Sequence, residues 1–218
     1  MRHFCTLFDR NYLSRGLALY ESLRTTSKGN VLTVLCLDTA TRDAISRLEL
    51  EDVKLVSTEA LEAWDPDLVR ARTNRSKVEY YFTCKPVLMA YVLRHSPDAA
   101  RVTYLDSDLC YFSATEMLDP ELAGTSVALT PHRFPPKLSE RRKYGEFNAG
   151  WVSASADSEG REFLQWWRDC CIDWCRMDVE PDRFGDQKYL DRVAELKASI
   201  ARTESDIAGI KRELSRAK

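Results

Sequence analysis

Two aspartates, Asp106 and Asp108, interrupt the apolar stretch YLDSDLCYF at residues 104–112. Residues 101–105 predict a strand that ends directly before Asp106, and in extended backbone the side chains of residues two apart point to the same side. Two carboxylates on one side can bind a single divalent cation such as Mg²⁺ or Mn²⁺, which removes their mutual repulsion. The same pair could instead belong to a solvated turn or cap the amino end of a helix.

The elements around this pair alternate in a way that is typical of an α/β fold. Short apolar runs predict strands at residues 4–8, 31–37, 53–56, 101–105, 126–130 and 147–152. Apolar residues at helical spacing predict helices at 13–23, 41–48, 77–94 and 159–175. The alternation favours a mostly parallel central sheet flanked by helices. In such sheets ligands bind beyond the carboxyl ends of the strands, where Asp106 and Asp108 are expected.

The composition is that of a globular and nearly neutral protein. The 218 residues are 44% hydrophobic and 30% charged, with a net charge of −2. This balance excludes a disordered chain and provides no basic field that would attract nucleic acid. No apolar run reaches the roughly 18 residues that a membrane span requires. Asp9 and Arg10 break the first apolar stretch too early for a signal peptide, so we expect a cytoplasmic location, with peripheral attachment to the inner membrane face as a variant.

The seven cysteines are irregularly spaced and contain no CxxC pair. We therefore expect reduced and mostly buried thiols, as is usual in the cytoplasm. Cys171 and Cys175 could share a helix face as metal ligands. No second ligand pair with zinc spacing follows them, which favours a packing role.

The last part of the chain has a different pattern. From residue 193, apolar or small side chains recur at spacings of three and four, at Val193, Leu196, Ile200, Thr203, Ile207, Ile210 and Leu214. This heptad pattern predicts a short coiled coil over 192–218, through which the chain could form a homo-oligomer. One amphipathic helix packed on its own domain is the alternative. The domain itself is expected to span 1–191.

Several motifs, taken in order, resemble glycosyltransferases of the A-type fold, particularly bacterial transferases related to the family-8 group. The motifs span most of residues 1–191, and they are FCTLFDRNYLSRGLALYESL, RSKVEYYFTCKPVLMAYVL, YLDSDLCYF, FNAGWV, WWRDCCIDWC and FGDQKYLD. The resemblance implies a metal-dependent glycosyltransferase that moves a hexose from a nucleotide-diphosphate sugar, with a UDP-sugar favoured, to a saccharide or lipid-linked acceptor. Bacterial surface-polysaccharide assembly is the implied setting, with retention of anomeric configuration favoured.

The resemblance also implies roles for individual residues. Asp106 and Asp108 match the DxD pair that holds Mn²⁺ or Mg²⁺ on the diphosphate. Positions expected to bind the donor are Thr6, Phe8, Asp9, Tyr12, Arg75, Lys77, Lys85, Ser107 and His132. Positions expected to face the transferred sugar are Asn148, Asp186 and Gln187. Carboxylate and amide side chains suit a ring of hydroxyls, and a metal with cationic side chains suits a diphosphate leaving group.

The segment PHRFPPKLSERRKYGE, residues 131–146, is polar and contains prolines, so it is expected to be a loop. His132 and Arg133 within it could contact the acceptor or the donor sugar, or lie on the surface without a special task. The basic cluster Arg141, Arg142 and Lys143 could meet a phosphorylated or lipid-linked acceptor. A solvated charged surface is the alternative interpretation.

The chain departs from the family pattern after residue 191. Relatives usually continue with another strand and a loop that often supplies a histidine as third metal ligand. Here Arg192 leads into the heptad pattern, and no histidine follows His132. A non-catalytic assembly module that oligomerises through its last helix is therefore the alternative function. A sugar nucleotidyltransferase is disfavoured, because FDRNYLSRG lacks a glycine-rich phosphate loop.

Overall fold

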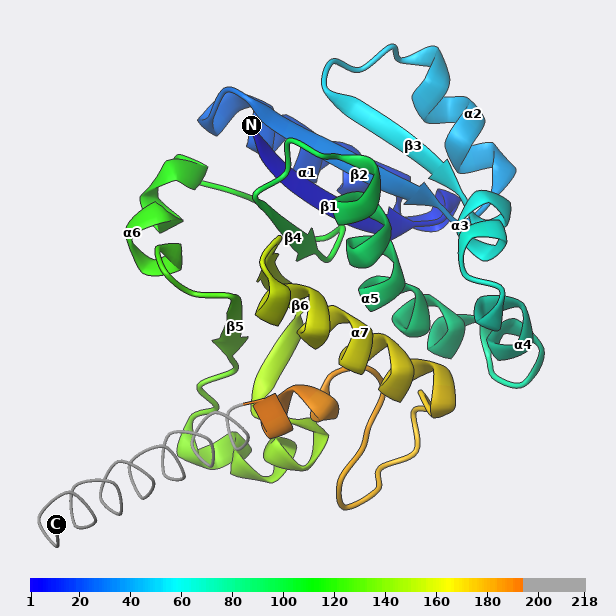
Figure 1. The fold of residues 1–218 in the computed structure, drawn as a ribbon, viewed down its shortest axis with the longest axis vertical. Coiled ribbons are helices and arrows are strands. Elements are labelled where there is room, and N and C mark those ends of the chain that lie inside the picture. Colours follow the sequence, from blue (N-terminus) through cyan, green and yellow to red (C-terminus); the bar gives the residue numbers. More distant parts are fainter. Residues whose placement is uncertain (194–218) are drawn as a thin grey trace, which may run out of the picture.

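The structure is a computed structural model that describes residues 1–193. These residues form one six-stranded sheet in the order β3-β2-β1-β4-β6-β5 (Figure 1). The strands are β1 (Arg2–Phe8), β2 (Asn30–Cys36), β3 (Val53–Ser57), β4 (Arg101–Leu105), β5 (Val127–Pro131) and β6 (Phe147–Ser155). Strands β1 to β4 pair in parallel, whereas β6 is antiparallel to both β4 and β5. Five of these six strands therefore run in one direction, and the expected α/β fold is confirmed.

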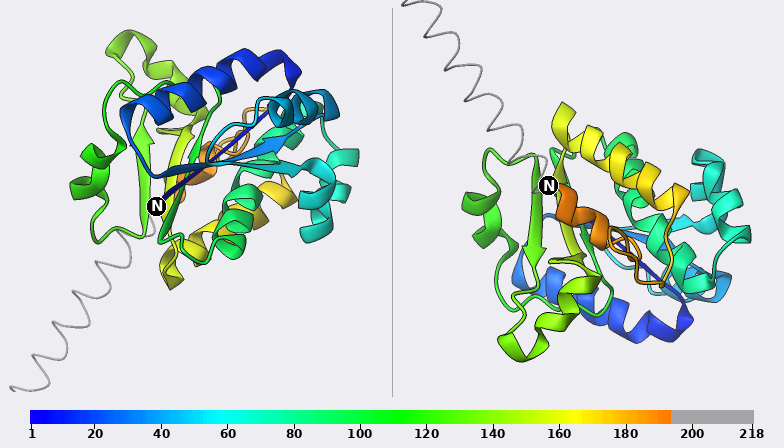
Figure 2. Two further views of the ribbon diagram at one scale, coloured as in Figure 1. Left: turned by 90° about the horizontal axis from the view of Figure 1, so that it is seen from above. Right: turned by 90° about the horizontal axis from the view of Figure 1, so that it is seen from below.

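Helices cover both faces of the sheet (Figure 2). One face carries α1 (Leu13–Thr26) and α2 (Thr39–Arg47), and the other carries α5 (Lys77–His95) and α7 (Ser158–Asp173). Side chains of β1 alternate between two hydrophobic clusters: Phe4 packs with α1, whereas Cys5 packs with α5 and α7. Burial on both faces explains why the strands are continuous apolar runs in the sequence.

Short helices complete the described part of the chain. They are α3 (Thr58–Trp64), α4 (Asp67–Thr73) and α6 (Asp119–Leu122), with the 3₁₀ segments η1 (Arg10–Tyr12), η2 (Thr115–Leu118), η3 (Pro136–Tyr144) and η4 (Lys188–Leu190). All seven cysteines lie within residues 1–193 and are free thiols, and five of them are buried, as expected. The predicted heptad helix over 192–218 lies outside the described residues, apart from Arg192 and Val193.

The prediction that 131–146 is a loop was wrong for its central part, which forms η3. Pro136 opens this segment, and proline suits the first turn of a helix because no hydrogen-bond donor is needed there. Tight turns follow, in which the amide of Leu138 donates to Pro135 and the amide of Gly145 donates to Arg142. Leu138 interrupts the helical backbone, so η3 consists of two short pieces.

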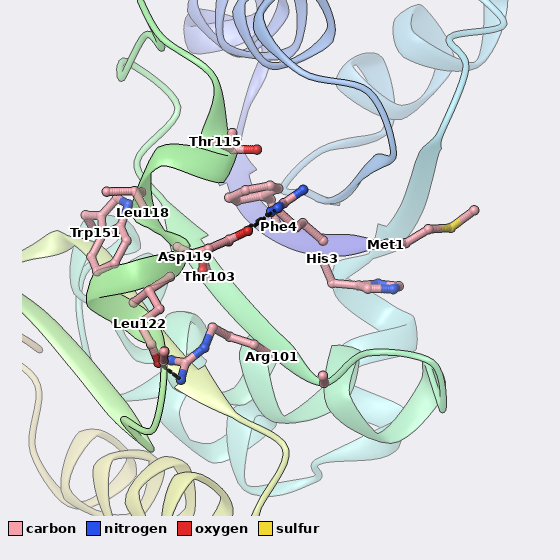
Figure 3. A pocket seen from close by; sticks show the side chains of 13 residues that line it. Met1, His3, Phe4, Arg101, Thr103, Thr115, Leu118, Asp119, Leu122 and Trp151 are labelled. Carbon is pink, nitrogen blue, oxygen red and sulfur yellow. Dashed lines mark hydrogen bonds and ion pairs between the residues drawn. The ribbon is translucent and has the colours of Figure 1, made fainter.

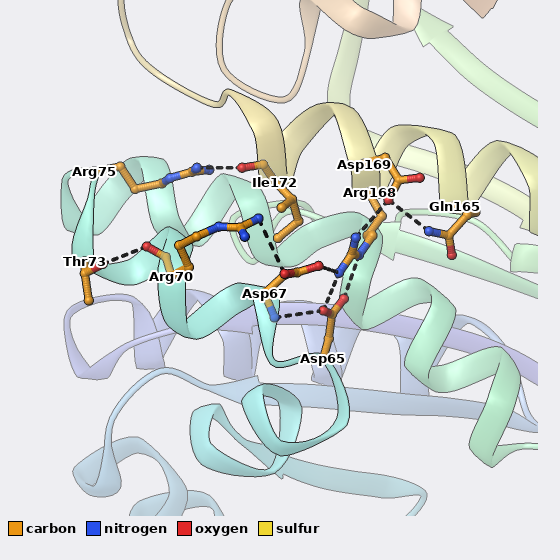
Figure 4. Close-up of polar contacts among 9 residues, drawn as sticks. All are labelled: Asp65, Asp67, Arg70, Thr73, Arg75, Gln165, Arg168, Asp169 and Ile172. Atoms are coloured by element: carbon orange, nitrogen blue, oxygen red, sulfur yellow. Dashed lines mark hydrogen bonds and ion pairs between the residues drawn. The ribbon is translucent and has the colours of Figure 1, made fainter.

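An ion-pair cluster joins α4 and the residue pair before it to α7 (Figure 4). The guanidinium of Arg168 on α7 donates from Nε to Asp65 at 2.8 Å and from Nη2 to Asp67 at 2.6 Å. Asp65 is buried, so its carboxylate depends on Arg168 for compensation. The hydrogen bond from Arg168 lowers the pKa of Asp67. The hydrogen bonds to Asp65 and Asp67 in turn raise the pKa of Arg168.

Arg168→Met is expected to lower the free energy of unfolding by about 3 kcal/mol, because it leaves the buried Asp65 carboxylate without a counter-charge. Denaturant unfolding followed by circular dichroism measures this change. Arg70→Met is the matched control, since Arg70 lies on α4 beside the same cluster but is exposed. Exposed ion pairs contribute little, so the control should unfold close to the wild-type midpoint. Equal losses in both variants would contradict the assignment.

Candidate active site

A cavity of about 430 Å³ lies beyond the carboxyl ends of β1 and β4, against α5. We call it the aspartate pocket. Eight of the residues predicted from the sequence line it, namely Phe8, Asp9, Tyr12, Lys77, Lys85, Asp106, Ser107 and Asp108. The position agrees with the rule that open α/β sheets bind ligands beyond the carboxyl ends of their strands.

One face of α5 points cationic and aromatic side chains into this pocket. Lys77, Tyr81 and Lys85 are spaced four residues apart, so they lie on one side of the helix, and all three line the pocket. The helix begins at a capping box, in which Ser76 and Glu79 each bond to the other's backbone amide. The capping box fixes where α5 begins, and therefore where its first residue, Lys77, lies relative to the pocket.

Asp106 is held in place by three neighbouring elements. Its Oδ1 accepts a hydrogen bond from the Tyr104 hydroxyl at 3.0 Å and lies 3.1 Å from Lys85 Nζ. Its backbone amide donates to the carbonyl of Gly150 on β6 at 2.8 Å, which continues the antiparallel pairing one residue past β4. Its Oδ2 faces Gly150, where a Cβ would lie only 2.6 Å away. Glycine at 150 therefore leaves the space that this carboxylate occupies.

Lys85 is a buried cation between two carboxylates. Its Nζ lies 3.1 Å from Asp106 and 3.1 Å from Asp186, and it donates to the carbonyl of Ala149 at 3.4 Å. Burial alone would lower the pKa of Lys85, but the two carboxylates raise it overall, so the amine stays charged. Burial raises the pKa of Asp186, and the nearby Lys85 charge offsets part of that rise. One cation, Lys85, thus pairs with two carboxylates, so the three side chains together carry a net negative charge when both aspartates are ionised.

The two aspartates fit a divalent cation. Asp108 is exposed, and the Asp106 side chain is 39% exposed, so both carboxylates are within reach of a ligand in the pocket. Carboxylate oxygens are the ligands that Mg²⁺ and Mn²⁺ prefer. Residues 1–193 contain no group of three His, Cys, Asp or Glu side chains that could hold a metal by themselves. A bound ion would therefore complete its coordination with substrate oxygens and water.

The opposite wall of the pocket is built around Asp9, at the end of β1. This buried carboxylate accepts hydrogen bonds from the amide and the side chain of Asn11, and from Lys77 Nζ at 3.2 Å. The Tyr81 hydroxyl beside it is buried and has no hydrogen-bond partner within residues 1–193. Tyr12 is 42% exposed at the rim, where the guanidinium of Arg15 stacks over its ring. This wall offers aromatic surface together with polar groups.

Three predicted donor contacts, namely Thr6, Arg75 and His132, do not line the pocket. Thr6 is fully buried within β1, on the opposite side of the strand from Cys5. Arg75 precedes α5, and its guanidinium donates to Thr83 and to the carbonyls of Cys171 and Ile172 at the end of α7 (Figure 4). Those carbonyls are unpaired groups at the end of a helix, which a cation stabilises. In the structure Arg75 therefore connects two helices.

The three residues predicted to face a sugar lie near the pocket and come from two segments, β6 and the segment after α7. Asp186 reaches it through the ion pair with Lys85. The side chain of Gln187 donates to the carbonyl of Tyr144 at 3.0 Å and accepts from the amide of Ala149 at 3.5 Å. Asn148 accepts from the amide of Gly150 at 2.8 Å. His132, which was expected to bind the donor, does not line the pocket and stacks on Phe134.

Sequence reasoning missed three residues that shape the pocket, namely Tyr104, Tyr81 and Gly150. Tyr104 had a usable signal, because it stands two residues before Asp106 and so points to the same side of the strand. Tyr81 had one too, since it lies midway between Lys77 and Lys85 at helical spacing. Gly150 had none, because its importance comes from the approach of Asp106, which the chain's sequence does not reveal.

A second cavity of about 430 Å³ lies at the opposite, amino end of β1 and β4 (Figure 3). The two arginines that line it already form ion pairs and hydrogen bonds with neighbouring protein groups. Arg2 pairs with Glu116 at 2.8 Å and with Asp119, and Arg101 donates to the carbonyls of Leu122 and Thr125. The aspartate pocket is therefore the better candidate for an active site.

Comparison with known proteins places the chain in a family. YfnF of Bacillus subtilis (strain 168), which is described as uncharacterized, is 30% identical over 204 residues, covering 90% of this chain and 67% of YfnF. The chain belongs to the YfnF family. YfnD from the same organism, also uncharacterized, is 32% identical over 196 residues, covering 88% of this chain and 62% of YfnD. No family model matches the chain described here.

Solved structures show the fold of this YfnF-family chain. The galactosyltransferase LgtC in complex with donor and acceptor sugar analogs matches with a TM-score of 0.59 and 17% identity, covering 87% of this chain and 69% of LgtC. Mouse xyloside xylosyltransferase 1 matches with a TM-score of 0.52 and 17% identity, covering 89% of this chain and 81% of that enzyme. The family member described here therefore has the glycosyltransferase A-type fold. Within residues 1–193 no helix has the length and apolar character needed to cross a membrane.

Proposed function

We propose that this chain is a metal-dependent glycosyltransferase that moves a hexose from a nucleotide-diphosphate sugar to a saccharide or lipid-linked acceptor. The supporting observation is the position of Asp106 and Asp108, which stand beyond β4 at an accessible pocket with the buried Lys85 behind them. The A-type fold and the likeness to LgtC support the same reaction class. We further propose bacterial surface-polysaccharide assembly as the setting, since the motifs resemble bacterial transferases.

The pocket supplies what a nucleoside diphosphate leaving group needs. Asp106 and Asp108 would hold a Mn²⁺ or Mg²⁺ ion, which would stabilise the negative charge that develops on the diphosphate. Lys85 adds a fixed positive charge on the same side, and Lys77 adds another at the rim. Phe8 and Tyr81 give the nucleoside an apolar wall. Because these groups are positioned before the donor binds, little reorganisation is required during the reaction.

The transferred hexose is expected to lie between the diphosphate site and Asp186. Through Lys85, Asp186 is positioned next to Asp106, and Gln187 follows it in the chain. Asn148 approaches from β6, beside Gly150. Carboxylate and amide groups of these types can fix the orientation of sugar hydroxyls. We propose that these three side chains orient the hexose toward the acceptor.

The first test is donor binding, measured by calorimetry with UDP-hexoses in the presence and absence of Mn²⁺. We expect binding that strengthens with Mn²⁺, and Asp106→Asn/Asp108→Asn should weaken the Mn²⁺-dependent binding at least about 100-fold, because metal–oxygen interactions contribute several kcal/mol. If UDP-hexoses do not bind, the same titration with GDP and other nucleotide sugars follows.

Glu159→Gln is the matched control for this test. It removes an exposed carboxylate in the first turn of α7 and should leave the Mn²⁺ response unchanged. Thermal unfolding of each variant establishes that it is folded. Failure of every nucleotide sugar to bind the folded wild-type chain would refute the proposed function and favour a non-catalytic module.

A further inference from the structure

A third cavity, of about 680 Å³, lies between η3 and the segment that connects α7 to η4. We call it the basic cavity. The residues that matter for its chemistry are His132, Arg141, Lys143, Tyr144, Phe184 and Gln187. The two segments that supply its lining residues are found in Figure 1 as the green segment before β6 and the orange segment after α7. Of its lining residues, Gln187 has already been proposed to orient the hexose, whereas Arg141, Lys143, Tyr144 and Phe184 have no role in the proposals above.

The basic cavity and the aspartate pocket are separated by residues 185–187. On one side Asp186 pairs with Lys85, which lines the aspartate pocket. On the other side the next residue, Gln187, lines the basic cavity and holds the carbonyl of Tyr144. A molecule in the basic cavity therefore lies across Asp186 and Gln187 from the proposed donor. An acceptor bound there would approach the proposed hexose site from the side of Gln187.

The charge of this cavity suits an anion. Segment 131–146 carries five basic and two acidic residues, although the whole chain has a net charge of −2. Arg142 pairs with Glu146 at 3.4 Å, whereas Arg141 and Lys143 form no ion pair within residues 1–193. Glu140 also lines the cavity, so the two cations exceed the carboxylates there. Guanidinium and ammonium groups bind phosphate through short charge-assisted hydrogen bonds.

The remaining walls suit a sugar ring. Tyr144 and Phe184 pack against each other as a tilted pair with ring centroids 4.8 Å apart, and Lys143 lies over the Tyr144 ring. Flat aromatic surface can pack against the C–H face of a pyranose while its edge groups reach the hydroxyls. Nε2 of His132 is buried and has no hydrogen-bond partner within the described residues. A buried polar atom of this kind is costly unless a ligand or water satisfies it.

We propose that the basic cavity binds the acceptor, and that this acceptor is a saccharide carrying a phosphate group, which Arg141 and Lys143 recognise. The proposal rests on the proposed glycosyltransferase function, because it names the second substrate of that reaction. A free glycosyl phosphate and a lipid-diphosphate-linked sugar share this chemistry. In either case an acceptor hydroxyl attacks the anomeric carbon of the hexose, the bond to the nucleoside diphosphate breaks, and the hydroxyl proton is released.

Transfer from the UDP-hexose that binds best is to be measured with three acceptors that carry the same sugar. They are the glycosyl phosphate, the sugar linked to a polyprenyl diphosphate, and the uncharged octyl glycoside. We expect one or both phosphorylated acceptors to have a KM at least about tenfold below that of the octyl glycoside, given the strength of charge-assisted hydrogen bonds. Preference for the polyprenyl form would identify a lipid-linked source, and equal use would identify the phosphate alone.

Arg141→Gln/Lys143→Gln is expected to raise the KM of the phosphorylated acceptor about tenfold or more, because two charge-assisted contacts are lost. The KM of the octyl glycoside and the rate of donor hydrolysis by water should not change. Lys137→Gln is the matched control, since Lys137 is an exposed cation on the same η3 segment and does not line the cavity. A uniform loss with charged and uncharged acceptors would overturn the proposal.

Direct binding separates this inference from the function on which it rests. Calorimetry with the glycosyl phosphate alone, and again with UDP and Mn²⁺ present, needs no turnover. If the donor fails to bind but the glycosyl phosphate binds and depends on Arg141 and Lys143, the anion site stands and the transferase proposal falls. If the donor is hydrolysed but the double variant leaves glycosyl phosphate binding unchanged, the transferase stands and the anion site is refuted.

Discussion

Lys85→Met is expected to lower turnover of the nucleotide sugar about 100- to 1,000-fold, the usual effect of removing one fixed group that stabilises developing charge. Lys85 Nζ lies 3.1 Å from both Asp106 and Asp186, and its loss would leave two carboxylates close together without a cation between them. The variant should also lose about 3 kcal/mol of stability, because a buried charge remains uncompensated. Donor hydrolysis and denaturant unfolding measure the two effects.

The control for Lys85→Met is Arg94→Met, on the same helix. Arg94 is exposed in the last turn of α5, so its replacement should change neither measurement greatly. Lys85→Arg separates charge from fit, since it keeps the cation but places a larger group in a buried site. Wild-type turnover in Lys85→Met would show that this amine has no part in the reaction.

Gly150→Ala is expected to weaken Mn²⁺-dependent donor binding about 10- to 100-fold, the range seen when groups that position metal ligands are changed. The added methyl group would lie 2.6 Å from Asp106 Oδ2 and 3.0 Å from Asn148 Oδ1. The carbonyl of Gly150 accepts a hydrogen bond from the Asp106 amide at 2.8 Å, which holds the two backbones together, so we expect the Asp106 carboxylate to shift. Calorimetry with and without Mn²⁺ measures the loss.

Gly124→Ala gives the matching comparison for this variant. It adds the same methyl group where nothing lies within 4 Å, but at a backbone φ of +70°. We expect a cost in stability of about 1 kcal/mol from the left-handed conformation, with the Mn²⁺ response unchanged. If Gly150→Ala binds the donor as the wild type does, the observed position of the Asp106 carboxylate is not required for Mn²⁺-dependent donor binding.

Most of the sheet could be predicted because its strands are marked by short apolar runs that end at polar residues. Residues 101–105 coincide with β4, and 53–56 differ from β3 by one residue. The helices α3 and α4 were not predicted, because each spans only seven residues and too few turns to show a clear period. The sequence predicts a loop where η3 forms, because prolines and charges conceal its short turns.

The site was predictable as a set of residue types, and less so as an arrangement. Eight predicted residues line the aspartate pocket, because strand ends and one face of α5 converge there. The motif that contains Arg75 predicts a donor contact for it. In the structure its guanidinium instead donates hydrogen bonds to carbonyls at the end of α7. The proposed acceptor site could be named only as a basic cluster, since its aromatic wall comes from two segments far apart in the sequence.

By itself the sequence determined the α/β fold and the placement of two aspartates after a strand, since local apolar patterns encode both. The tertiary structure alone decided the partners of those aspartates. Lys85 meets Asp106 and Asp186 because packing brings α5 against the end of β4 and the segment after α7. It also decided that a side chain at position 150 would displace Asp106, because the register between β4 and β6 brings that backbone against the Asp106 carboxylate. Such contacts join residues distant in the chain, and local patterns carry no record of them.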